Sequence, residues 1–160
     1  MIQAITETGF NIYVQTEDNR INTSVASTQI RHLVKFTNDL DKSVYYAYGN
    51  TETIKDRYTQ INLSYGASPN IYTGVVKLFP AGYYKYEIYE VSWIGTVTVS
   101  LGNAPANEND VLSPVAETKG VVQGLVAIGI LYLAEKSGSE EVQYTEYTPP
   151  ASTNTIYYGQ

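Results

Sequence analysis

Apolar and polar residues alternate with a period of two through most of this chain of 160 residues. In residues 29–37, for example, Val34 and Phe36 fall on one side of an extended chain while Lys35 falls on the other. This alternation is typical of antiparallel strands with one side in the core and one side in water. Because no long stretch has helical spacing, the pattern predicts an all-β chain.

The polar and turn-forming residues between the alternating segments divide the chain into short strands. The turn signals include the run from Asn38 to Ser43 and the sequence Ser68-Pro-Asn70. Strands are predicted over residues 11–15, 29–37, 44–48, 57–65, 73–79, 82–91, 93–101 and 128–134. A chain of this length can build one sandwich with an extension.

The most informative short pattern contains Leu78, Pro80, Gly82, Tyr84 and Tyr86. It resembles the corner between strands E and F of immunoglobulin-like and fibronectin type III sandwiches. The resemblance implies that the hydroxyl of Tyr84 bonds to backbone a few residues upstream and that Tyr86 takes a core position. The alternative interpretation is an ordinary hairpin with a Pro-Gly turn.

Two segments depart from a minimal sandwich. Residues 92–124 form a long insertion before the closing strand, where a loop or small hairpin is predicted as a contact surface because long loops are uncommon unless they are functional or disordered. From residue 136 onward the chain is rich in Ser, Thr, Glu, Pro and Tyr. The predicted fold is therefore an Ig-like or fibronectin III-like antiparallel β-sandwich over residues 1–135 with an extended C-terminal arm, residues 136–160.

Large apolar and aromatic side chains in these two segments are the candidates for binding a partner, since such residues anchor protein interfaces. They are Trp93 in the insertion and Tyr144, Tyr147, Ile156, Tyr157 and Tyr158 in the arm. The sixteen tyrosines of the chain suit both half-buried strands and interfaces. The alternative for the arm is that it packs back on its own domain.

Charge and composition argue against two classes of partner, nucleic acids and membranes. The net charge is -6, and the basic residues stand singly, so no direct nucleic-acid partner is expected. Residues 1–10 lack the pattern of a signal peptide, and the longest apolar stretch, residues 125–134, is too short to span a bilayer, so no membrane partner is expected either. The absence of cysteine excludes disulfides and thiolate metal sites.

The residues that would carry catalysis are sparse. His32 is the single histidine and falls on the apolar side of a predicted strand, so we expect a core or interface role for it. Glu87 and Glu90 lie on opposite faces of one strand and cannot flank one bond. Residues 107–110 lack the ligand spacing of a calcium loop. The sequence therefore predicts a protein that is not an enzyme and holds neither a cofactor nor a metal.

Three elements resemble small β-rich structural proteins of tailed phages, of the type found in phages of marine bacteria and Bacteroidetes. They are Phe36-Thr-Asn-Asp39, Asp56-Arg-Tyr58 and Tyr83-Tyr-Lys-Tyr-Glu-Ile-Tyr-Glu90. The resemblance implies a virion protein, assembled in the host cytoplasm, that binds other capsid or neck proteins and copies of itself. Capsid decoration is the first expectation, and a head-to-tail connector, neck or tail component is the second.

A carbohydrate-binding module is the alternative from another functional class. Its sugar rings would stack on exposed tyrosines such as Tyr83 and Tyr89. This alternative requires a concave face with coplanar rings.

Overall fold

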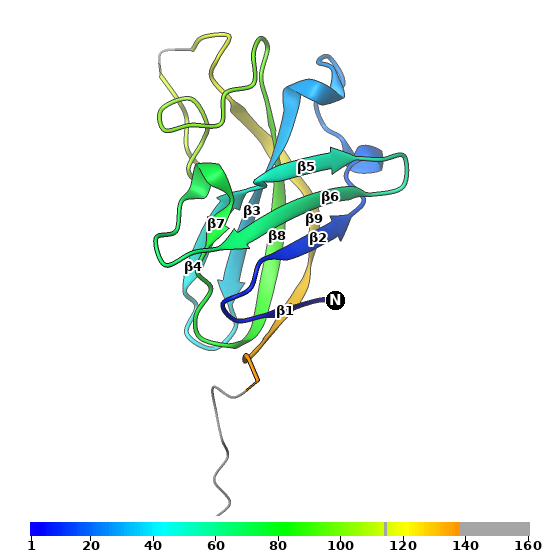
Figure 1. Cartoon of the computed structure of the whole chain (residues 1–160). Helices are drawn as coiled ribbons and strands as arrows, with labels where there is room; N and C mark the ends of the chain where they lie inside the picture. The colour runs from blue at the N-terminus through cyan, green and yellow to red at the C-terminus, as the bar shows by residue number, and fades with distance from the viewer. Residues whose placement is uncertain (114, 138–160) are drawn as a thin grey trace, which may run out of the picture.

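The structure is a computed structural model, and it describes residues 1–113 and 115–137. In these residues nine strands form two sheets that pack face to face (Figure 1). The strands are β1 (Ile2–Ile5), β2 (Phe10–Val14), β3 (Ile30–Asn38), β4 (Val44–Tyr48), β5 (Thr51–Ile54), β6 (Thr59–Tyr65), β7 (Val75–Val76), β8 (Gly82–Ser92) and β9 (Val121–Ala134). Single-turn 3-10 helices cover Glu17–Asn19, Ser27–Gln29 and Ile71–Thr73. The predicted all-β sandwich is confirmed.

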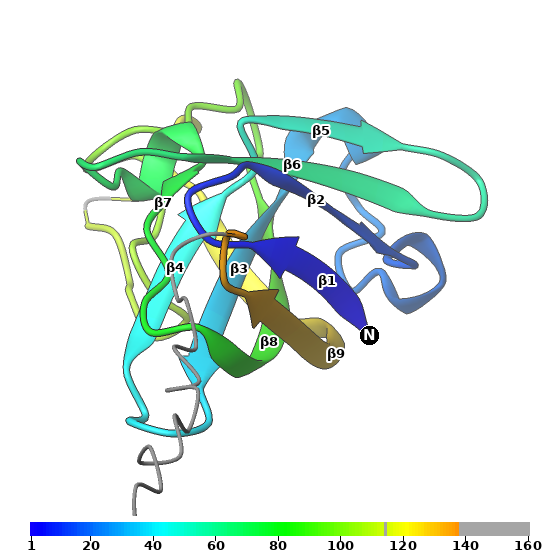
Figure 2. The ribbon, with the colours of Figure 1, turned by 60° about the horizontal axis from the view of Figure 1, so that its bottom comes forward.

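The first sheet has five strands in the order β1-β9-β8-β3-β4, and the second has the order β2-β6-β5 with β7 paired to β6. Strand β8 runs antiparallel to both β3 and β9, whereas the short β1 runs parallel to the end of β9. Figure 2 shows β1 beside β9 at the margin of the first sheet. The immunoglobulin-like character of the sandwich stays a prediction.

The main core lies between the two sheets and consists of the inward side chains that the alternation predicts. Val34, Phe36 and Ile88 from the first sheet meet Ile12 and Ile61 from the second, all with no exposed surface. Burial of such aliphatic and aromatic side chains stabilises the fold by about 1.5–3 kcal/mol each. Packing of these side chains therefore stabilises the core without a disulfide.

The corner forms the contact that its sequence pattern implies. The hydroxyl of Tyr84 donates a hydrogen bond of 2.5 Å to the carbonyl of Pro80, four residues upstream. Tyr84 is fully buried, and Tyr86 and Leu78 are each 7% exposed in the main core. Gly82, where β8 begins, has a φ of 135°, which a side chain would strain.

Several strand boundaries differ from the prediction. The predicted strand at residues 93–101 is not a strand, and the one at 73–79 shrinks to Val75–Val76. Strands β1 and β5 were not predicted from the pattern, and the closing strand β9 begins at Val121 rather than at residue 128. In residues 93–101, Val97 and Val99 alternate because they pack on the first sheet, not because they pair with another strand.

The segment between β8 and β9, residues 93–120, is a folded cover and is called the insertion below. It packs on the outer face of the first sheet, where Leu33 of β3, Tyr48 of β4 and Val91 of β8 are buried in a second apolar cluster. Figure 1 shows it at the end of the sandwich where β9 begins. The hydroxyl of Tyr48 donates a hydrogen bond of 2.7 Å to the carbonyl of Pro105. The first sheet is therefore covered on both sides at this end, and the expectation of one wet face is wrong there.

A polar cluster fastens the insertion to the sheet. The carboxylate of Glu108 accepts hydrogen bonds from the ammonium of Lys35 and, at 2.6 Å, from the hydroxyl of Tyr46. Burial would raise the pKa of Glu108, but these two hydrogen bonds hold it below its usual range. Burial and the bond to Glu108 raise the pKa of Tyr46 to about 12.

Candidate protein-interaction surface

Strand β9 carries large apolar side chains on both of its faces. Leu131 and Leu133 point into the main core, whereas Ile128 and Ile130 on the opposite face are 57% and 51% exposed. Leu125 and Tyr132 continue the outer row at 45% and 36% exposure. Together with Tyr83 of β8, which is 53% exposed, these four residues of β9 form the surface that is called the β9 face below.

The register between β8 and β9 determines what borders this row. Tyr83 lies opposite Tyr132, Lys85 opposite Ile130, and Glu87 opposite Ile128. The rings of Tyr83 and Tyr132 are tilted against each other with their centres 4.9 Å apart. The ammonium of Lys85 bonds to the carboxylate of Glu87 at 2.9 Å. Lys85 and Glu87 therefore border the apolar row, and the ammonium of Lys35 lies 3.7 Å from the carboxylate of Glu87 as well.

The other long side of β9 is only partly paired. Strand β1 pairs with residues 131–134 of β9, so the remainder of β9 has no strand beside it on that side among the described residues. The segment before β3 approaches there, and the side-chain amide of Asn19 donates a hydrogen bond of 3.0 Å to the carbonyl of Val126. The buried carboxylate of Glu90 holds this segment by accepting the backbone N–H groups of Ile21 and Asn22 at 2.9 and 2.8 Å.

An apolar groove extends the surface at the start of β9. It has a volume of about 440 Å³, and its apolar lining comes from Val111, Leu112 and Val115 of the insertion and from Val121 and Val122 of β9. Polar residues 108–110 of the insertion line it as well. Val111 and Val115 are 86% and 78% exposed. Exposed apolar side chains thus continue from the insertion onto β9.

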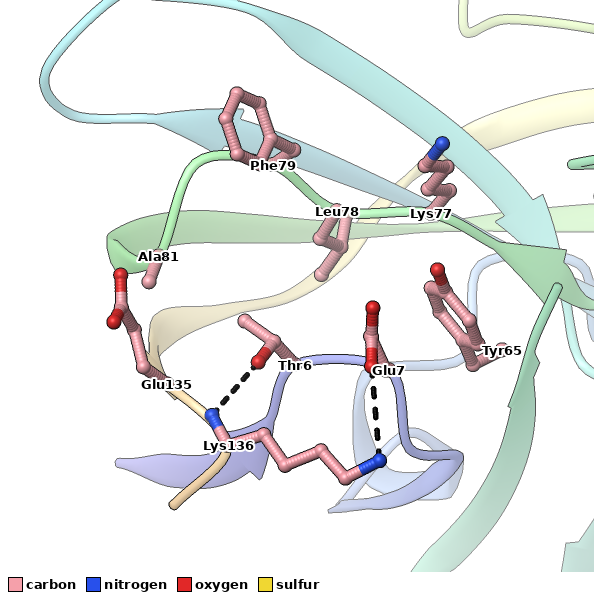
Figure 3. A pocket seen from close by; sticks show the side chains of 9 residues that line it. All are labelled: Thr6, Glu7, Tyr65, Lys77, Leu78, Phe79, Ala81, Glu135 and Lys136. Atoms are coloured by element: carbon pink, nitrogen blue, oxygen red, sulfur yellow. Dashed lines mark hydrogen bonds and ion pairs between the residues drawn. The ribbon is translucent and has the colours of Figure 1, made fainter. Parts of the chain in front are cut away.

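A second hollow of about 260 Å³ lies at the opposite end of the sandwich, beside the corner (Figure 3). Its lining combines Lys77 and Lys136 with Glu7 and Glu135, and Leu78 lies on one of its walls. The carboxylate of Glu7 and the ammonium of Lys136 are 3.6 Å apart.

One histidine and one carboxylate meet between the sheets, but they are inaccessible. The Nδ1 atom of His32 on β3 lies 2.9 Å from Oε2 of Glu52 on β5, and the backbone N–H of His32 donates to Oε1 at 3.0 Å. The two side chains are 3% and 2% exposed. Their pairing joins the two sheets, and the expectation that His32 is a satisfied core residue is confirmed. Within residues 1–113 and 115–137, no three potential ligands gather as a metal site.

Trp93 does not belong to a surface, and its prediction as a partner-binding residue is wrong for this fold. Its side chain has no exposed area, and its Nε1 atom donates a hydrogen bond of 3.1 Å to the carbonyl of Thr118 within the insertion. The ring follows β8 directly and turns onto the outer face of the sheet, where it anchors the second cluster.

The other predicted partner-binding residues lie outside the described part of the chain. They are Tyr144, Tyr147, Ile156, Tyr157 and Tyr158 of the arm. Of the predicted arm, Lys136 and Ser137 are described, and the backbone N–H of Lys136 donates to the hydroxyl oxygen of Thr6 at 2.9 Å. The partner role of the arm stays a prediction.

The geometry around Tyr83 and Tyr89 does not suit the stacking of sugar rings. Both lie on the outer face of the first sheet, but Tyr89 is half-buried against the second cluster. The exposed ring of Tyr83 is tilted by 44° from that of Tyr132. In the described part of the chain these rings form no coplanar platform for a carbohydrate.

Sequence reasoning missed the β9 face, although a signal was present. Residues 125–134 carry apolar side chains at both parities, which a strand with one wet face would not need. Apolar residues at both parities also fit a strand that is buried on both faces. Only the position of the insertion shows that, among the described residues, the outer face of this strand is uncovered.

No helix in the described ranges is long and apolar enough to cross a membrane. Comparison of the chain with protein-family models, with curated proteins and with solved structures gives no match.

Proposed function

We propose that this chain is a non-enzymatic structural protein that binds another protein through the β9 face, as a component of a tailed-phage virion. The observation that carries the proposal is the row of Leu125, Ile128, Ile130 and Tyr132, each between 36% and 57% exposed on one strand. Single exposed apolar residues are ordinary, but a contiguous exposed apolar patch marks an interaction site. Strand β9 pairs with β8 along almost its whole length, which holds these side chains in a fixed arrangement.

The contrast with the rest of the same sheet face supports this interpretation. The chain covers Leu33, Tyr48 and Val91 with its own insertion and fastens that cover through Glu108. It leaves the neighbouring apolar row uncovered within the described residues. A partner protein that covers the row would remove its apolar surface from water and gain about 25 cal/mol per Å² before the costs of association.

The virion assignment is supported by the resemblance of three sequence elements to phage structural proteins. In the fold these elements build strands and turns, since Phe36 lies in β3, Asp56 in the connection between β5 and β6, and Tyr83–Glu90 in β8. Strands and turns of this kind stabilise the sandwich, and a structural component of a particle needs a stable fold. We propose that the protein decorates the capsid surface. A position in the connector, neck or tail is the second candidate.

The test is incorporation into particles by full-length variants. In cells that assemble the particle, the double variant Ile128→Lys/Ile130→Lys is compared with wild type and with Thr51→Lys/Thr53→Lys, which places the same charges on exposed positions of β5. We expect the β9 variant to lose about tenfold or more of its co-sedimentation with particles, since buried anchors dominate interface energy. The β5 control is expected to keep it.

Thermal unfolding of both double variants accompanies this comparison, because a misfolded chain would also be lost. Equal incorporation of the β9 variant and the β5 control would contradict the β9 face as a docking surface. Absence of the wild-type chain from purified particles would contradict the virion assignment.

The predicted role of the arm is tested separately by deletion of Pro149–Gln160. We expect this truncation to lower incorporation while the melting temperature of the sandwich stays near that of wild type. Normal incorporation would count against a contact through the arm and would leave the β9 face as the proposed docking surface.

A further inference from the structure

We propose that the protein that covers the β9 face is a second copy of this chain, bound antiparallel about a two-fold axis. This inference rests on the proposed function, because it names the partner of the same surface. A two-fold interface needs a patch that is complementary to itself, so that each contact occurs twice. The β9 face meets this requirement in its apolar row, in its bordering charges and in its relation to the insertion.

The apolar row is close to symmetric about its middle. With the axis between Ile128 and Ile130, each of these residues faces the other in the second copy, and Leu125 at one end faces Tyr132 at the other. All four side chains project outward from one strand of one sheet. Two such rows can interdigitate at the spacing of about 10 Å that is usual between packed sheets.

The bordering charges match the same arrangement. Lys85 lies opposite Ile130 and Glu87 lies opposite Ile128 across the β8–β9 register, so the two charges follow the row in a fixed order. Reversal of the strand direction in the second copy places each Lys85 against the other copy's Glu87. The side chain of Lys85 is 46% exposed and that of Glu87 is 15% exposed, so Lys85 is the residue that reaches across. The chain as a whole carries a charge of -6, so a contact region with balanced charge is where two copies repel each other least.

The position of the insertion is compatible with the antiparallel pairing. The insertion stands over the part of the outer face that contains Leu33, Tyr48 and Val91, beside the start of β9. In a parallel arrangement both insertions would lie at the same end of the paired strands, and neither Lys85 would face a Glu87 of the other copy. In the antiparallel arrangement each insertion lies over the opposite end of the partner's sheet, which is the end that the partner's own insertion leaves open.

The first measurement is the mass of the isolated full chain by light scattering over a wide range of concentrations. We expect a dimer of about 35 kDa, twice the chain mass of 17.7 kDa, at the higher concentrations. Ile130→Lys is expected to remain a monomer with an unchanged melting temperature, and Thr53→Lys is expected to dimerise like wild type. A monomeric wild type, or a dimer that survives Ile130→Lys, would overturn the inference.

A charge exchange tests the antiparallel contact itself. Lys85→Glu alone places carboxylates against carboxylates across the axis, and Glu87→Lys alone places ammonium groups against each other. We expect each variant to raise the dimer dissociation constant by about tenfold, because facing like charges cost interface free energy. An equimolar mixture of the two variants is expected to form a heterodimer, since every facing pair is then opposite in charge. A mixture that stays as weak as the separate variants would overturn the antiparallel arrangement.

The two levels of the proposal fail in distinguishable ways. A monomeric wild type combined with loss of particle incorporation by Ile128→Lys/Ile130→Lys would mean that the β9 face binds a different protein. A dimer that depends on Ile130 but never co-sediments with particles would keep the pairing and contradict the virion assignment.

Discussion

The hydroxyl of Tyr84 lies 2.5 Å from the carbonyl oxygen of Pro80 and donates a hydrogen bond to it. This bond fastens the beginning of β8 to the turn that precedes it. Strand β8 is the centre of the first sheet, flanked by β3 and β9. The corner therefore fixes the strand on which the register of β9, and with it the β9 face, depends.

Removal of the Tyr84 hydroxyl should weaken the fold without a change in shape. Tyr84→Phe is expected to lower the free energy of unfolding by about 1–2 kcal/mol, because the part-buried carbonyl of Pro80 then keeps only the 3.4 Å hydrogen bond from the side-chain amide of Asn38. Tyr13→Phe is the matched control, since Tyr13 is 56% exposed and its hydroxyl has no hydrogen bond to another described residue. Denaturant unfolding measures both. Equal stabilities of the two variants would contradict a stabilising role for the corner bond.

Alkaline pH should destabilise the protein through its buried tyrosines. Burial raises the pKa of Tyr84 to about 12 and also raises the pKa of Tyr48 and of Tyr86. Because the pKa in the unfolded chain is about 10, the neutral hydroxyl is the form that the fold favours. This contribution is complete below pH ~10 and is lost as the pH rises from there through the folded pKa.

The check is denaturant unfolding at a series of alkaline pH values, with tyrosinate absorbance recorded in parallel. We expect the free energy of unfolding to decline above pH ~10 and the decline to be shallower in Tyr84→Phe. A stability that is constant through this range would show that these hydroxyls ionise as easily in the fold as in the unfolded chain.

The contact between His32 and Glu52 should stabilise the packing of the two sheets. Glu52→Ala removes the acceptor of the His32 backbone N–H and the partner of its imidazole, and we expect it to cost about 3 kcal/mol. Glu52→Gln should cost less, because its amide oxygen still accepts the N–H. Denaturation midpoints are compared with those of Thr53→Ala, an exposed neighbour on β5. A loss in Glu52→Ala no larger than in this control would contradict the role of the pair.

A methyl group at Gly120 should displace Trp93 and loosen the insertion. A Cβ atom there would come within 2.6 Å of the indole ring, which is closer than atoms can pack. Because Trp93 is the single tryptophan, its emission reports this site, and we expect Gly120→Ala to shift the emission to longer wavelength and to increase quenching.

Protease sensitivity of residues 93–120 is expected to rise in Gly120→Ala as well. Ser113→Ala, at an exposed position of the same insertion, is the control and should leave both signals unchanged. Unaltered tryptophan emission in Gly120→Ala would mean that the ring has room to move within the second cluster.

Local pattern was sufficient to predict the elements that depend on neighbouring residues. The alternation of β3 and β8 and the turn after Asn38 arise within short stretches of chain. The bond from Tyr84 to Pro80 also joins near neighbours, but it was expected from the resemblance to the corner of immunoglobulin-like sandwiches. A residue two positions along a strand necessarily lies on the same face, so sequence spacing alone predicts the inward row. The short strands β1 and β5 were missed because their pairing partners, β9 and β6, are what make them strands.

The sequence by itself determined an all-β chain, the residues of its corner and the apolar stretch at residues 125–134, because period-two alternation and turn chemistry are local properties. Only the tertiary structure decided which of these apolar side chains are covered. Trp93 is buried and Ile130 is exposed because the insertion folds over β3, β4 and one end of β8 and, among the described residues, leaves the outer row of β9 from Leu125 to Tyr132 uncovered. Burial of a strand's outer face depends on segments that are distant in sequence, and no spacing within the strand records where they lie.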